Sequence, residues 1–145
     1  MAVNDRTLTA LQAVLDYDQI SDAVMLPEEQ LARFAAAYLA YAAANRHRWS
    51  ALFQHRLPLG HTVMPEYEAR QSAVFARVGA LIGVIRPDLT VDQRTLWSRT
   101  LFSAVHGVVL LGLEEKLDVV SRSTLEGQLR DLVSVLAAGL NQGRP

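Results

Sequence analysis

The chain has 145 residues, half of them hydrophobic, and a formal net charge of −1. This length is enough for one well-packed core and short for two domains, so we expect a single domain over residues 1–145. The near-neutral charge excludes an overall basic surface, the feature that attracts nucleic acid or anionic lipid. The sequence contains no cysteine, which excludes disulfides, thiolate chemistry and cysteine-ligated zinc and fits a reducing, cytoplasmic compartment.

The sequence shows neither a secretion signal nor a membrane span. Residues 1–7 contain no basic segment followed by a long apolar core. The longest uncharged apolar run, residues 105–113, ends at Glu114 and falls short of the ~18 residues that cross a bilayer. Alanine and leucine are abundant, whereas β-branched runs and glycine-proline clusters are few. This composition favours an all-α fold, an antiparallel bundle of about five to six helices.

The first two helices are predicted from apolar spacing and start signals. Residues 3–20 carry apolar side chains at helical spacing, which predicts a first amphipathic helix. Pro27 suits the first turn of a second helix, because its missing N–H would have no partner there. Glu28 and Glu29 complement the positive end of the helix dipole.

The second helical pattern is long for so small a domain. It continues to Pro58, which for an unbroken helix of roughly 28 residues would span about 40 Å. We therefore expect a kink or break at residues 45–48. Residues 56–63 contain Pro58 and Gly60 and are predicted to form the main surface loop.

The third long helix begins with the same signal, at Pro65. Its single apolar stripe consists of Tyr67, Val74, Phe75, Val78, Leu81, Ile82 and Ile85. It should end before Arg86, because the residue that precedes Pro87 is pushed out of helical geometry.

Residues 90–117 are apolar around most of the helix circumference, and we expect them to form the buried centre. At about 100° per residue, one side carries Trp97, Leu101, Ala104, Val105, Val108 and Leu111. The opposite side carries Phe102, His106, Val109, Leu110 and Leu113. Thr100, Ser103 and Gly107 form a strip of small residues between the two sides, and Thr90 with Gln93 makes a capping box. A helix with two apolar faces needs two partners, its own domain and a candidate second subunit.

The last helix is predicted over residues 123–140. Ser123 with Glu126 makes a second capping box. The apolar series consists of Leu125, Leu129, Leu132, Leu136 and Leu140. Packing within the subunit is the simpler interpretation of this series. Dimerisation is favoured because one small domain can hardly cover both faces of the preceding helix as well.

Signatures of catalysis and of metal binding are missing from the sequence. There is no G-x-S-x-G nucleophile motif, no glycine-rich phosphate loop and no pair of carboxylates on an apolar face. The four histidines, His47, His55, His61 and His106, do not have metal-ligand spacing. We therefore expect that the protein is not an enzyme and needs neither a metal nor a cofactor.

His106 has two interpretations that the sequence leaves open. It is either a core histidine whose ring is satisfied by a neighbouring polar group, or a polar contact that orients an apolar ligand in a cavity. Aromatic residues recur on the predicted inward faces, where a packed core is the usual explanation and a pocket the alternative. The basic residues 46–48 with Arg56 read as a solvated helix end, with an acidic ligand at a pocket mouth as the alternative.

Several of these stretches together resemble a known family. They are Trp97, the pair His106-Gly107, residues 113–117 (LEEKL), residues 4–8 (NDRTL) and residues 49–58 (WSALFQHRLP). In their order and spacing they resemble the Trp/His-Gly type of C-terminal domain found in TetR-family transcriptional regulators. The resemblance covers most of the chain.

The resemblance implies a bacterial effector-binding and dimerisation domain. A small, mostly apolar effector of unknown identity would lie between the long helices, against Tyr38, Tyr41, Trp49, Phe53, Tyr67, Phe75, Phe102 and His106. The last two long helices, about residues 90–116 and 123–140, would form a four-helix bundle in a homodimer. Its interface would contain Trp97, Thr100, Ala104, Gly107, Leu111, Leu125, Leu129, Leu132 and Leu136.

The resemblance also implies a DNA-binding domain that this chain lacks. TetR-type regulators contact DNA through an N-terminal helix-turn-helix of roughly fifty residues, so we expect no operator binding by the 145-residue chain. In the intact regulator, the effector would tilt the first helix and change the spacing of the two DNA-reading heads, a shift of populations.

Two rival interpretations belong to other functional classes. One is a headless protein-interaction module whose apolar faces form homo- or mixed dimers without a ligand. The other is a small-molecule enzyme of unrecognised type, which lacks support because no activated nucleophile or acid–base pair is visible.

Overall fold

A computed structural model describes residues 9, 12–13, 25–54, 65–115 and 120–143, with the backbone alone for 52–54, 65–68 and 70–71. The elements within these ranges are the helices α2 (Pro27–Ala44), α3 (Arg46–Gln54), α4 (Pro65–Ile85), α5 (Val91–Leu113) and α6 (Arg122–Gln142). The predicted all-α bundle is therefore confirmed. The helix expected over residues 3–20 lies almost wholly outside the described residues, and the loop expected at 56–63 lies outside them entirely.

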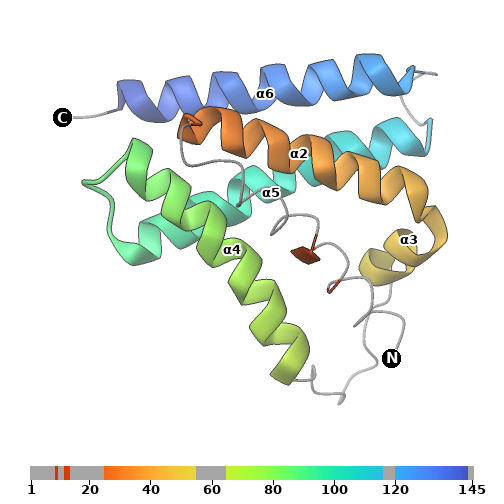
Figure 1. Cartoon of the computed structure of the whole chain (residues 1–145), viewed down its shortest axis with the longest axis horizontal. Coiled ribbons are helices and arrows are strands. Elements are labelled where there is room, and N and C mark those ends of the chain that lie inside the picture. Colours follow the sequence, from red (N-terminus) through yellow and green to blue (C-terminus); the bar gives the residue numbers. More distant parts are fainter. Residues whose placement is uncertain (1–8, 10–11, 14–24, 55–64, 116–119, 144–145) are drawn as a thin grey trace.

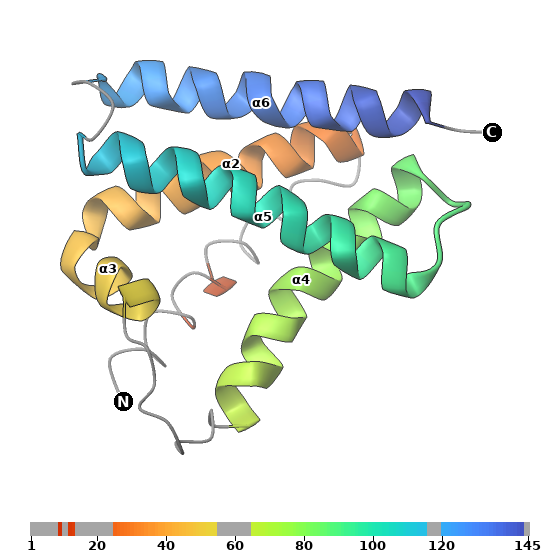
Figure 2. The same cartoon turned by 180° about the vertical axis from the view of Figure 1, so that it is seen from behind.

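Figures 1 and 2 show a bundle in which α2, α5 and α6 group together and α4 crosses them. Helix α6 runs along one edge and packs on both α2 and α5, which also contact each other. Helix α4 crosses the other side of this group and packs mainly on α5, with further contacts to α2. The space enclosed by α2, α4 and α5 is where the candidate site lies.

The predicted break in the second helix is confirmed at Asn45. Helix α2 begins at Pro27 as expected and ends at Ala44. The backbone N–H and the side-chain Nδ2 of Asn45 both donate to the Tyr41 carbonyl, each at 3.0 Å, which terminates the helix. The chain then restarts as α3, whose Trp49 N–H donates to the Asn45 carbonyl at 2.9 Å. The break turns Trp49 back toward α2.

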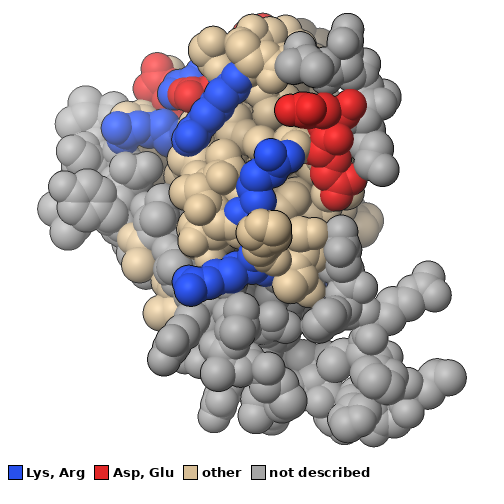
Figure 3. Space-filling model, turned by 90° about the vertical axis from the view of Figure 1, so that its right-hand side faces the viewer, with Lys and Arg blue, Asp and Glu red and all other residues tan. Residues whose placement is uncertain are grey.

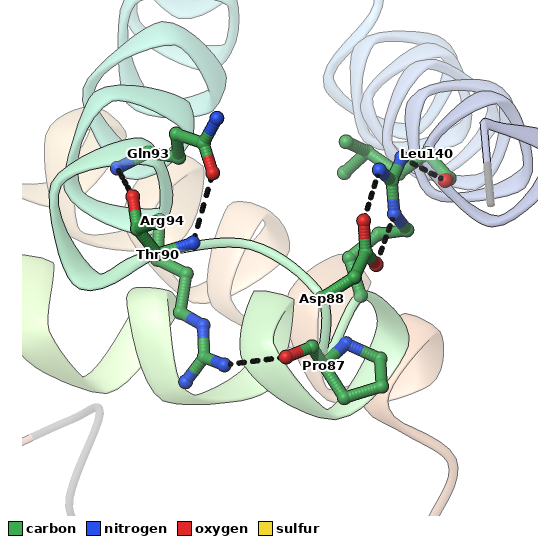
Figure 4. A network of polar contacts seen from close by, with 7 residues as sticks. Pro87, Asp88, Thr90, Gln93, Arg94 and Leu140 are labelled. Carbon is green, nitrogen blue, oxygen red and sulfur yellow. Dashed lines mark hydrogen bonds and ion pairs between the residues drawn. The ribbon is translucent and has the colours of Figure 1, made fainter. Parts of the chain in front are cut away.

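The corner between α4 and α5 is held by polar contacts (Figure 4). Helix α4 ends at Ile85, as the following Arg86-Pro87 pair predicts. Arg86 donates from Nε and Nη2 to the Asp88 carboxylate at 2.7 and 2.6 Å, and from Nη1 to the Leu140 carbonyl at 3.1 Å. These contacts tie the corner to the last turn of α6, and the hydrogen bond to Asp88 raises the pKa of Arg86.

The capping box predicted for α5 is confirmed, and the one predicted for α6 is wrong. The Gln93 N–H donates to Thr90 Oγ1 at 3.3 Å, and the Thr90 N–H donates to Gln93 Oε1 at 2.8 Å. Helix α6 instead begins one residue before Ser123, and its N-cap is Ser121. The backbone of Ser121 is extended, so its Oγ can accept the Thr124 N–H at 3.2 Å.

The buried side of α5 is narrower than the sequence suggests. Its buried residues, Ser98, Leu101, Val105 and Val109, form one stripe. Trp97 and Leu111 are 36% and 38% exposed, so a single subunit leaves part of the apolar circumference of this helix uncovered. The reason is the helical angle: Leu101 is turned from Trp97 by about 40°, enough to carry it from the rim into the core.

Helix α6 contributes a full face to the core of the subunit. Its buried residues are Leu125, Leu129, Val133, Ala137 and Leu140, while Leu132 and Leu136 are half-buried at its edge. At Gly112 of α5 the two helices approach closely, since a Cβ there would lie 2.7 Å from both Leu125 methyl carbons. Leu125 and Leu129, two of the predicted interface residues, are therefore packed within the subunit.

Helix α5 is also long and apolar enough, by composition, to pass as a membrane span. Its most apolar 18-residue window has a mean hydropathy of 1.4. From the sequence we expect no membrane span, because no uncharged apolar run is long enough. The 18-residue window can include charged residues, which an uncharged run by definition does not. In the structure α5 packs against α4 and α6, as the central helix of a bundle does.

Candidate ligand-binding site

An apolar cavity lies between α2, α4 and α5, with α6 closing it from behind. Its volume is about 60 Å³, counted as the space that the centres of water-sized molecules can occupy. The described residues that line it are Leu31, Phe34, Ala35, Tyr38, Val74, Phe75, Val78, Ser98, Leu101, Phe102, Val105 and Val133. The described part of the lining contains no charged side chain, and its side-chain polar atoms are the hydroxyls of Tyr38 and Ser98.

Helical spacing explains why these residues meet. On α2 the lining residues recur at intervals of three and four, which keeps them on one face. The residues from α4 and α5 follow the same rule, so each helix turns one apolar stripe toward the same space. Gly79 allows α4 and α5 to approach closely, because a Cβ there would lie 3.2 Å from Ser98 Oγ. Ser98 Oγ itself donates to the Arg94 carbonyl at 2.8 Å, so its hydroxyl is satisfied within α5.

A chain of hydrogen bonds stands beside the cavity. Trp49 Nε1 donates to the Tyr38 hydroxyl at 2.8 Å, and the same hydroxyl lies 2.8 Å from Nδ1 of His106. Because the indole nitrogen can only donate, the Tyr38 oxygen is its acceptor. Between Tyr38 and His106 the direction of the hydrogen bond follows the tautomer of the imidazole. The chain joins α3, α2 and α5.

Burial keeps this cluster uncharged near neutral pH. Burial raises the pKa of the Tyr38 phenol, and the hydrogen bond from Trp49 lowers it by a smaller amount. Burial also lowers the pKa of the His106 imidazole below its ordinary value. Both shifts disfavour the charged form, as expected for groups removed from water without a charged partner. The cluster is therefore suited to neutral ligands nearby.

Phe102 is the centre of an aromatic group that spans the cavity wall. Its ring makes edge contacts with Tyr38, at 5.4 Å between centroids and 65° between planes, and with Phe75, at 5.5 Å and 85°. It stacks on His106 at 5.8 Å and 17°. These distances and angles are those that aromatic pairs favour. The group connects α2, α4 and α5 through side chains that face the same space.

Five of the predicted ligand-binding residues come together in the structure, and three of them line the cavity. The cavity-lining ones are Tyr38, Phe75 and Phe102. Trp49 and His106 contact Tyr38 but are not part of the described lining. This position of His106 favours the first interpretation, a histidine satisfied by a neighbouring polar group, over a direct contact with a ligand. Tyr41 is buried on α2 away from the lining, and the side chains of Phe53 and Tyr67 are outside the description.

None of the aliphatic lining residues was among the predicted ligand-binding residues. Val74 and Val78 on α4, and Leu101 and Val105 on α5, have the same pattern as ordinary core residues, which gives no sign of a cavity. Phe34 had a usable signal, because it precedes Tyr38 by one helical turn and shares its face.

The predicted interface residues of α5 form a continuous outward stripe. Trp97, Thr100, Ala104, Gly107 and Leu111 fall within about 80° of the helix circumference. Trp97 and Thr100 border a shallow groove between α5 and α6 that Leu136 also lines. The Thr100 hydroxyl donates to the Leu96 carbonyl at 3.0 Å. This hydroxyl is thus satisfied within the helix and needs no partner from outside.

Charged residues gather at neither of these surfaces. Arg46, His47 and Arg48 are all exposed at the start of α3, as a solvated helix end would be. The face shown in Figure 3 carries basic and acidic side chains together, around uncharged surface. Among the described residues, no three histidine or acidic side chains come close enough to hold a metal ion.

Comparison with known proteins assigns the chain to a family. A family model described as "Tetracyclin repressor-like, C-terminal domain" matches residues 31–136. No curated protein matches the chain significantly. The matched residues include all the described lining of the cavity and the outward stripe of α5. Domains of this family belong to regulatory proteins. The chain therefore belongs to the family of tetracyclin repressor-like C-terminal domains.

Proposed function

We propose that the protein is the effector-sensing and dimerisation domain of a bacterial, cytoplasmic TetR-like transcriptional regulator. The effector is a small, mostly apolar molecule that binds in the cavity between α2, α4 and α5. The observation that carries this proposal is the cavity itself, whose lining is apolar and whose two hydroxyls are engaged within the protein. Ligand sites are characteristically concave and apolar, with few polar groups.

The energetics of packing support a ligand rather than a structural void. Protein interiors are packed as densely as organic crystals, and an unfilled cavity lowers stability by forfeiting contacts on its walls. A molecule that fills the space regains those contacts. The aromatic wall centred on Phe102 would give such a molecule favourable edge and face contacts.

The outward stripe of α5 supports a homodimer. Trp97 and Leu111 at its two ends are exposed large apolar residues, and Gly107 has open space where a Cβ would lie. Small residues allow a second backbone to approach closely, so a two-fold contact of α5 and the edge of α6 would give a four-helix bundle. This arrangement would cover Thr100 and Leu136 as well.

The hydrogen-bond chain suggests how an effector would act on the rest of the regulator. Tyr38 both lines the cavity and bonds to Trp49 of α3, so a ligand that displaces the Tyr38 ring moves α3 relative to α2. Such a shift would change the geometry presented to an N-terminal helix-turn-helix domain, which we propose makes all contacts with DNA. The effector would thus redistribute two populations.

A thermal-shift screen of the 145-residue chain with small neutral and charged molecules tests the proposal, together with light scattering for mass. The proposal predicts a dimer whose melting temperature rises with at least some neutral apolar compounds. A dimer that responds to no small molecule would instead favour the interaction-module alternative, in which the apolar faces bind protein alone. A monomer with no ligand response would contradict both.

A further inference from the structure

The chemistry of the cavity wall restricts what kind of effector it accepts. Every described lining side chain is apolar except for those of Tyr38 and Ser98. The Tyr38 hydroxyl accepts from Trp49 and lies 2.8 Å from His106, and the Ser98 hydroxyl donates to the Arg94 carbonyl. The hydrogen of the Ser98 hydroxyl is already engaged, so a ligand acceptor would have to break that contact, whereas a ligand donor could still reach a lone pair of either oxygen. The described wall therefore favours a molecule with few polar groups.

Charge is disfavoured more strongly than polarity. Moving an ionised group into an apolar site without a partner costs several kcal/mol or more. The guanidinium of Arg77 lies 4.9 Å from the centroid of the Phe34 ring and is not part of the described lining. A carboxylate inside the cavity would therefore find no compensating charge in the described lining.

The size of the cavity matches one ring. One water needs about 10–15 Å³ of this volume, so 60 Å³ corresponds to about four to six waters. Since a water fills about 30 Å³ of liquid, the displaced volume is ~120–180 Å³. An apolar cavity of about 150 Å³ accommodates one benzene molecule. A single ring therefore fills the space that the described lining surrounds.

The arrangement of aromatic side chains selects an aromatic ring over a saturated one. Tyr38, Phe75 and Phe102 already form two successive edge-to-face contacts, at 5.4 and 5.5 Å between centroids. Phe34 lies on the same wall. An added aromatic ring extends this series, and each such pair contributes about 0.5–1.5 kcal/mol beyond the area that it buries.

We propose that the effector is a neutral, single-ring aromatic molecule without a charged group, held by the aromatic wall of Tyr38, Phe75 and Phe102. This inference rests on the proposed function and names the chemical class that the site takes. Acidic or basic relatives of the same ring bind far more weakly, because the described lining offers no partner for their charge.

Titration calorimetry of the full 145-residue chain with four probes tests the proposal. Toluene is the neutral aromatic, benzoate and benzylammonium are its anionic and cationic relatives, and methylcyclohexane has the same carbon skeleton without the aromatic ring. We expect toluene to bind about threefold or more tightly than methylcyclohexane. We expect benzoate and benzylammonium to bind at least about a hundredfold more weakly than toluene.

Two substitutions on α4 locate the binding. Val78→Phe fills the cavity from its wall and should weaken toluene binding by about tenfold or more. Val84→Phe makes the same change at a position of α4 that is 63% exposed and outside the lining, and should leave the affinity within about twofold. Circular dichroism checks that each variant is folded, and Val74→Phe, at another lining position, replaces Val78→Phe if that variant is unstable.

The outcomes separate this inference from the proposed function. Tight binding of benzoate would overturn the neutral-ligand inference, while leaving the sensing function in place. Equal affinity for methylcyclohexane and toluene would overturn the aromatic part alone. Binding of none of the four probes would overturn both the inference and the proposed role of the cavity. Unchanged affinity in a folded Val78→Phe variant would show that toluene binds elsewhere.

Discussion

The hydroxyl of Tyr38 is the residue-scale feature on which the site most depends. It accepts from Trp49 and contacts His106, each at 2.8 Å, while its ring faces the cavity. Tyr38→Phe keeps the ring and removes the hydroxyl, which leaves the buried indole N–H without its acceptor. We expect the free energy of unfolding to fall by about 1–3 kcal/mol in denaturant titrations.

Tyr41→Phe is the matched control for this change. Tyr41 is also buried on α2, one turn further along, and takes no part in the hydrogen-bond chain. Its substitution should change stability by less than about 0.5 kcal/mol. Equal losses in the two variants would mean that the chain of hydrogen bonds adds nothing specific.

His106 should make stability depend on pH. Burial lowers its pKa in the folded state, so the unfolded chain binds its proton more readily. The contribution of His106 is therefore complete above the unfolded pKa of about 6.5 and is lost as pH falls through the lower, folded pKa. Unfolding curves recorded between about pH 7.5 and 5 should show stability decreasing toward acid.

A pair of variants assigns this pH dependence. His106→Gln cannot take up the proton, so its stability should fall less between the same pH values than that of the unsubstituted chain. His47→Gln removes a histidine that is exposed on α3, and it should retain the full fall. If both variants behave like the unsubstituted chain, another group is responsible.

At the residue scale the sequence indicated the aromatic cluster but not the cavity. Tyr38, Phe75, Phe102, Trp49 and His106 were predicted as a group, and the structure brings them together. Which of them face open space depends on small rotations between helices that no periodicity encodes. A valine beside a cavity has the same pattern as a valine in a packed core.

At the scale of helices, the close approach of α5 and α6 depends on Gly112. A Cβ at this position would lie 2.7 Å from both methyl carbons of Leu125, which is itself buried and has little room to move. Gly112→Ala should therefore destabilise the protein by about 1–3 kcal/mol in spite of the better helix propensity of alanine. Thermal or chemical unfolding measures the change.

Gly127→Ala on α6 is the matched control. A Cβ there would meet nothing within 4 Å, and the position is exposed within the helix. Only the better helix propensity of alanine then matters, so the free energy of unfolding should rise by about 0.5–1 kcal/mol. Stabilisation by both alanines would show that the two helices can separate without loss.

Helix boundaries were predicted where the chain carries strong local signals. Pro27, Pro65 and the Arg86-Pro87 pair mark ends that the structure reproduces, because proline restricts the backbone directly. The N-terminus of α6 was misplaced because two serines lie two residues apart, and sequence alone does not show which one has the extended backbone. The buried side of α5 was overestimated, because its apolar residues serve both the core and the exposed stripe.

At the scale of the whole molecule, we expect a homodimer through the outward stripe of α5. Thr100 lies in the middle of this stripe and is exposed in the subunit. Thr100→Arg places a long cation there and should weaken dimerisation by about tenfold or more in sedimentation equilibrium, with the subunit still folded.

Thr95→Arg provides the control on the same helix. Both threonines are exposed, and each donates its hydroxyl to the carbonyl four residues earlier at 3.0 Å. Thr95 lies about 140° around α5 from Thr100, outside the stripe. Its substitution should leave the dimer intact; equal weakening by both arginines would place the interface elsewhere.

The central claim is that the cavity between α2, α4 and α5 receives a ligand, and its most direct test is a crystal of the protein exposed to bromobenzene. Anomalous scattering from bromine locates the ring without assumptions about the rest of the structure. The account predicts a bromine peak inside the cavity, against Phe75 and Phe102 and beside Tyr38. A cavity closed by its own side chains, with bromine bound only at the surface, would contradict it.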